Sequence, residues 1–145
     1  MPLMESNIRY YILAGAALLG LFINMSFSWL LVMPDWSLSI LLAMLLSQRS
    51  TWYWVLPLIG LHDYLLFCSV WVVFPFAVLS ALLLMYADVS LAPGQYQRWA
   101  SLLLACAPLL FADVGWLPWL LTVTLTVWIW SYLSVKREKV YVEPT

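Results

Sequence analysis

Residues 52–87 read WYWVLPLIGLHDYLLFCSVWVVFPFAVLSALLLMYA, an almost unbroken apolar stretch that decides the fold. As one helix it would rise about 54 Å at about 1.5 Å per residue, whereas the hydrocarbon core of a bilayer is about 30 Å thick. The stretch must therefore turn back on itself and form two membrane helices. His62, the single histidine of the chain, and Asp63 lie inside this hairpin. Ionisable side chains within a membrane are costly and mark function by default, so both are candidate site residues.

Composition extends this conclusion to the whole chain. The sequence is 66% hydrophobic and 9% charged, whereas a soluble domain carries about 25% charged residues. Residues 1–145 are therefore predicted to form a single polytopic membrane domain whose main partner is the lipid bilayer. The net charge is -1 and the sequence has no basic block, so nucleic acid is not an expected partner.

Polar turns and proline or glycine signals divide the chain into segments. The predicted spans are residues 10–32, 36–46, 52–67, 71–87, 99–112 and 116–135. Pro34, Asp35 and Trp36 form the turn before the second span, where Asp35 suits the positive end of the helix dipole and Trp36 marks an interface. Within the first span, Ala16 and Gly20 have the small-xxx-small spacing that permits close approach of helices.

The distribution of charge gives the orientation. With a cytoplasmic N-terminus and six spans, every cation falls in a cytoplasmic segment: Arg9, Arg49, Arg98, Lys136, Arg137 and Lys139. The outer turns contain Asp35 and Asp113 and no cation, which agrees with the positive-inside rule. The predicted fold is an all-α integral membrane protein, a compact bundle of six transmembrane helices with cytoplasmic N- and C-termini.

Motifs of enzymatic chemistry are missing from the sequence. It has no Gly-x-Ser-x-Gly, no His-Glu-x-x-His and no phosphate-binding glycine loop. Cys68 and Cys106 lie in apolar runs without a neighbouring metal-ligand pattern and are expected to be small buried side chains. We therefore predict no catalytic residue, no cofactor and no metal, and a protein that is not an enzyme.

Three interpretations compete for the intramembrane polar residues His62, Asp63 and Asp113. They can be structural fasteners that form hydrogen bonds between helices. They can mark a proton or solute path through the membrane. Alternatively, Asp63 and Asp113 can be an aspartyl pair that activates water, as in membrane-embedded proteases.

Two short motifs carry a resemblance to a known family. Pro34–Asp35–Trp36 before a short Leu/Ile-rich span, followed by Gly60–Leu61–His62–Asp63 in the next span, resembles the MreD family of rod shape-determining membrane proteins. Leu110–Phe111–Ala112–Asp113 is similar to the acid after an apolar run in that family. The resemblance implies a non-enzymatic scaffold subunit of the peptidoglycan elongation machinery (the elongasome) in the bacterial inner membrane, with MreC-type and RodA/PBP2-type partners. Homo-oligomer formation is compatible with this role.

The alternative function is transport. MreD-like proteins resemble the substrate-binding membrane subunits (S-components) of energy-coupling-factor vitamin transporters, which also have six short helices. A small-molecule pocket near His62 and Asp63 would favour this alternative, whereas a filled core with grooves on its outer surface would favour the scaffold.

Overall fold

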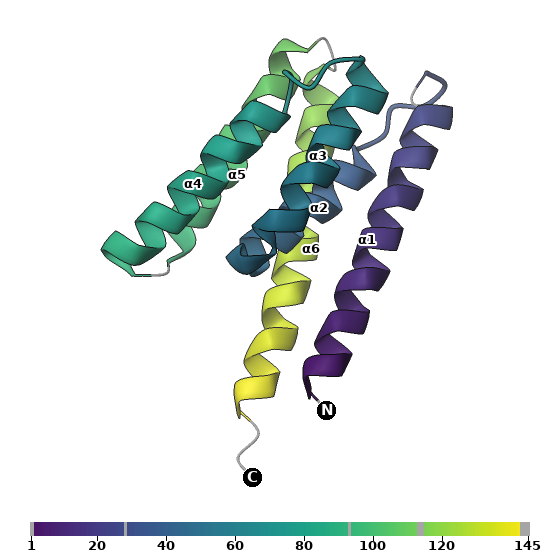
Figure 1. The fold of residues 1–145 in the computed structure, drawn as a ribbon. Helices are drawn as coiled ribbons and strands as arrows, with labels where there is room; N and C mark the ends of the chain where they lie inside the picture. The colour runs from purple at the N-terminus through teal and green to yellow at the C-terminus, as the bar shows by residue number, and fades with distance from the viewer. Residues whose placement is uncertain (1, 28, 93, 113–114, 143–145) are drawn as a thin grey trace.

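The computed structural model describes residues 2–27, 29–92, 94–112 and 115–142, and the regular structure of this part is entirely helical (Figure 1). The elements are α1 (Pro2–Phe27), α2 (Trp36–Ser47), the short 3-10 helix η1 (Arg49–Thr51), α3 (Trp52–Phe67), α4 (Phe74–Leu91), α5 (Gln95–Phe111) and α6 (Trp116–Val142). The predicted order of six α-helices is therefore confirmed in the described part of the chain.

Several boundaries differ from the prediction. α1 ends at Phe27 rather than Val32, and α4 begins at Phe74 rather than Trp71, while α5 begins earlier and α6 ends later than expected. Pro75 lies in the first turn of α4, where its missing N–H costs no helical hydrogen bond. The connection between α3 and α4 is therefore longer than the three-residue turn that the sequence indicated.

Three of these helices have the length and apolar character needed to cross a membrane. They are α1 over Ile8–Phe27, α4 over Phe74–Leu91 and α6 over Trp116–Ser134. At 12, 16 and 17 residues, α2, α3 and α5 are shorter. By length and composition the described chain is thus an all-helical membrane protein.

Helix α2 lies at the centre of the bundle, between α1, α3, α5 and α6 (Figure 1). Its residues from Leu41 to Leu46 are all buried, and Ser37, Leu38 and Ser39 are buried as well. A helix that is apolar on every side is typical of a fully enclosed position. The shortest apolar helix therefore forms the core, and the longer helices surround it.

The contact between α1 and α2 depends on Gly20. A Cβ atom at this position would lie 2.9 Å from Cβ of Trp36 and 3.1 Å from the backbone nitrogen of Ser37. At Gly15 a Cβ atom would meet nothing within 4 Å. Gly20 therefore allows the backbone of α1 to approach the first residues of α2 closely, whereas Gly15 takes no part in this contact.

The two cysteines differ in their surroundings. Cys106 is buried in α5, as predicted, but Cys68 is exposed. Cys68 ends α3 in the left-handed conformation, with φ of 54°, and its backbone N–H donates to the carbonyl of Tyr64. The prediction of a buried Cys68 is wrong because the apolar run there is a turn rather than the interior of a helix.

Candidate functional site

Asp35, His62 and Asp63 form a hydrogen-bonded triad at the end of the bundle where α2 and α4 begin, which we call the Asp35 end. The Nε2 atom of His62 lies 2.5 Å from Oδ2 of Asp35, and its Nδ1 atom lies 3.2 Å from Oδ1 of Asp63. His62 and Asp63 are fully buried, and the Asp35 side chain is 13% exposed. The three groups therefore join the start of α2 to α3.

Each carboxylate of the triad also caps a helix. Oδ1 of Asp35 accepts a hydrogen bond from the backbone N–H of Leu38 at 3.1 Å, which makes Asp35 the N-cap of α2. Oδ2 of Asp63 accepts from the backbone N–H groups of Val73 and Phe74, at 2.6 and 2.7 Å. The first N–H groups of a helix lack partners within it, so Asp63 satisfies donors at the start of α4. The predicted role of Asp35 at a helix N-terminus is confirmed.

The hydrogen bonds of the triad satisfy its three side chains within the protein. Both ring nitrogens of His62 face carboxyl oxygens, so the ring donates at one nitrogen and either donates or accepts at the other, according to which group holds the shared proton. The two carboxyl groups also face the positive ends of α2 and α4, each equivalent to roughly half a charge.

Two further residues complete the hydrogen bonds of the connection between α1 and α2. The side chain of Asn24 donates to the carbonyl of Pro34 and accepts from the backbone N–H of Trp36, both at 3.0 Å. The hydroxyl of Thr122, in α6, accepts from the backbone N–H of Asp35 at 3.0 Å. The sequence analysis missed both residues, although an asparagine inside the apolar first span was a usable signal.

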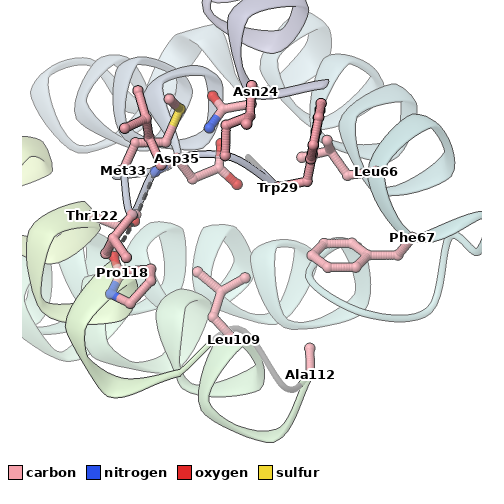
Figure 2. Close-up of a pocket in the computed structure, with 13 residues that line it drawn as sticks. Asn24, Trp29, Met33, Asp35, Leu66, Phe67, Leu109, Ala112, Pro118 and Thr122 are labelled. Atoms are coloured by element: carbon pink, nitrogen blue, oxygen red, sulfur yellow. Dashed lines mark hydrogen bonds between the residues drawn. The ribbon is translucent and has the colours of Figure 1, made fainter. Parts of the chain in front are cut away.

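A partly open pocket of about 490 Å³ lies beside the triad (Figure 2). Its walls come from the α1–α2 connection, from the end of α3 and from α5 and α6: Asn24, Trp29, Leu30, Leu31, Val32, Met33, Asp35, Leu66, Phe67, Leu109, Ala112, Pro118 and Thr122. Of these, Asp35 alone carries a charge, and the polar atoms of Asn24 and Thr122 are engaged by the protein itself. Most lining side chains are therefore apolar, with one carboxylate among them, while polar and apolar atoms contribute to the exposed surface of the pocket in similar amounts.

A second polar cluster lies at the opposite end of the bundle, which we call the Arg98 end. Two guanidinium nitrogens of Arg98 lie 3.2 and 3.1 Å from the two carboxylate oxygens of Asp88. The Nε–H of Arg98 donates to the carbonyl of Leu46, in the last turn of α2, and Nη1 donates to the carbonyl of Gly94. Through Arg98, this cluster connects α5 to α2 and α4 by hydrogen bonds. Both charged residues were predicted to lie between the fourth and fifth spans, and their pairing was not predicted.

The remaining candidate residues are placed as follows. Pro34 precedes the N-cap of α2, Trp36 is its first residue, and Asp113 lies outside the described residues. Among the described residues, no group of three or more His, Cys, Asp and Glu side chains is arranged to hold a metal ion. Both oxygens of Asp63 are bonded within the protein, one to His62 and the other to the start of α4. Of the three interpretations, these contacts favour the structural fastener.

The chain has no significant match among protein-family models, curated proteins or solved structures. The class of protein therefore follows from its helices, and its function from the arrangement of their side chains.

Proposed function

We propose that the protein is a six-span integral membrane scaffold of the bacterial envelope, related in role to MreD, with both termini in the cytoplasm. In this orientation the Arg98 end faces the cytoplasm and the Asp35 end faces outward. The short helices α2, α3 and α5 cross as parts of the packed bundle, because charged and polar groups at both ends of α2 bind it to its neighbours. The placement of all six cations on the cytoplasmic side supports this orientation.

The observation that carries the proposal is the large apolar surface left on the outer helices. Only 22% of the candidate span in α1 is buried inside the molecule, 33% of that in α4 and 17% of that in α6. Exposed large side chains include Tyr11, Leu19 and Phe22 on α1 and Trp128 on α6. Such surfaces require lipid or neighbouring membrane proteins as cover, and a scaffold acts through contacts of this kind.

The buried polar residues support the same role. Asp35, His62, Asp63, Asp88 and Arg98 each bind other parts of the chain, so they stabilise the bundle without a substrate. In a bilayer, helices associate through close packing and a few polar contacts, because lipid removes the hydrophobic driving force. A rigid bundle with apolar flanks can thus hold MreC-type and RodA/PBP2-type partners within the membrane.

Depletion in a rod-shaped host tests the proposal. We expect cells that lose the protein to become round or wide, and the tagged protein to co-purify with a single-span envelope protein of the MreC type. Cell width is measured during depletion and after expression of the wild-type chain as the control. Normal cell shape after complete depletion would contradict the scaffold function.

The pocket beside Asp35 favours a second candidate, a small-molecule-binding subunit of a transporter. A volume of about 490 Å³ and a lining that combines apolar side chains with a few polar groups are typical of ligand sites. Ala112→Phe would fill the pocket without changing the triad. If the protein is a transporter subunit, this variant loses uptake of radiolabelled vitamins while cell shape stays normal. If the protein is a scaffold, its depletion changes cell shape and leaves vitamin uptake unchanged.

A further inference from the structure

The Asp35 end of the molecule exposes large apolar side chains in its connections as well as on its helices. Trp29 and Trp71 are each 78% exposed, and Phe111, the last residue of α5, is 87% exposed. We use the name apolar rim for six exposed residues at this end: Trp29, Leu30, Leu31, Val70, Trp71 and Phe111. Connections that lie in water are normally polar, so this composition points to a different surrounding.

Several backbone N–H groups at this end of the molecule are bonded inside the protein. The N–H groups of Leu30 and Leu31 donate to the carbonyl of Phe27, and that of Trp71 donates to the hydroxyl of Ser69. The side chains of Asn24, Asp63 and Thr122 accept from the backbone N–H groups of Trp36, Val73, Phe74 and Asp35. Partners of this kind lower the cost of placing these donors in a layer that is poor in water.

The lengths of the neighbouring helices lead to the same conclusion. With 16 and 17 residues, α3 and α5 rise about 24 and 26 Å, which is less than a hydrocarbon core of about 30 Å. In the proposed orientation the Asp88–Arg98 ion pair, at the start of α5, lies at the cytoplasmic end of the bundle. The missing height therefore falls at the Asp35 end.

We infer that the apolar rim lies in the headgroup–acyl boundary of the outer leaflet, where it contacts lipid, and that the bilayer is locally thinner around α3 and α5. The polar network of Asn24, Asp35, Asp63 and Thr122 then has a specific purpose. It supplies hydrogen-bond partners to the backbone at the starts of α2 and α4, where water would supply them outside the membrane. This inference rests on the proposed crossing of α3, α4 and α5 and is independent of the scaffold role.

The native Cys68 is a suitable position for a test because it is exposed beside Val70 and Trp71. A polarity-sensitive fluorophore on Cys68 in a Cys106→Ala protein is compared with the same label on Ser90→Cys in a Cys68→Ala, Cys106→Ala protein. Ser90 is exposed near the Arg98 end of α4 and is the matched control. Both proteins are placed in nanodiscs, so that lipid and water can reach both faces.

For the Cys68 label we expect emission at shorter wavelength, strong quenching by lipids with a nitroxide near the headgroup and weak quenching by iodide. The Ser90→Cys label should emit at longer wavelength, with weak quenching by the nitroxide lipids and strong quenching by iodide. Equal quenching of the two labels by iodide would overturn the inference. Loss of cell shape on depletion bears on the scaffold alone, so the two proposals can fail separately.

A pair of charge substitutions provides a test that does not depend on the label. Trp71→Glu places a carboxylate in the apolar rim, and Leu91→Glu places one on an exposed residue near the Arg98 end. We expect Trp71→Glu to lower the yield of membrane-inserted protein, while Leu91→Glu leaves it unchanged. Equal yields from the two variants would contradict a lipid-contacting rim.

Discussion

At the scale of single residues, Asp63 joins α3 to the start of α4 and uses both of its carboxyl oxygens in hydrogen bonds. Its Oδ2 atom accepts from two backbone N–H groups, and its Oδ1 atom faces the His62 ring. Asp63 lies one turn before the end of α3, where it stabilises the start of the next helix.

Substitutions of Asp63 should separate its hydrogen bonds from its charge. Asp63→Asn retains an oxygen for the amides of Val73 and Phe74, and its NH₂ group can donate to a neutral His62 ring, so we expect a folded protein with a small loss of stability. Asp63→Leu should lower the free energy of unfolding by about 3 kcal/mol, because two buried donors lose their acceptor at about 1–3 kcal/mol each. Denaturant titration of the purified proteins in detergent measures the difference. Equal stability of the two variants would show that the α4 cap contributes little.

At the scale of elements, the contact of α1 with α2 makes a sharp prediction because α1 contains two glycines in different surroundings. Gly20→Ala should destabilise the protein by about 1–3 kcal/mol, since the new methyl group would overlap Trp36 and the backbone of Ser37. Gly15→Ala is the matched control, with the same gain in helix propensity of about 1 kcal/mol and no steric conflict. Thermal unfolding in detergent compares them. An equal effect of both substitutions would exclude close packing at Gly20.

The elements also show what could be predicted from the sequence. The bounds of α3 and the start of α2 are as predicted, because a polar turn and the Pro34–Asp35–Trp36 signal lie beside apolar runs. The start of α4 differs from the predicted one because its cap comes from Asp63, which lies ten residues before Val73 in the chain. Hydropathy does not reveal such a contact. Two members of the triad were predicted as site residues, but their contact with the third was not, because that contact also joins distant parts of the chain. His62 and Asp63 were conspicuous in an apolar span, whereas their link to Asp35 requires the folded arrangement of α2 and α3.

At the scale of the whole molecule, the proposed orientation predicts which end a water-soluble reagent can reach. A cysteine at Ser90, in a chain without Cys68 and Cys106, should react with an impermeant maleimide in inside-out vesicles and be protected in right-side-out vesicles. A permeant maleimide is the control and should label both preparations. Labelling of right-side-out vesicles by the impermeant reagent would contradict cytoplasmic termini with six spans.

The central position of α2 has a consequence for biosynthesis. The backbone N–H of Asp35 bonds to Thr122, which lies 87 residues later in the chain, and Ser39 bonds to the carbonyl of the same residue. When α2 leaves the ribosome, the helix that will cover much of it does not yet exist. The core of the protein can therefore close only after the last helix enters the membrane, and until then α2 depends on lipid, on the insertion machinery or on a chaperone for protection.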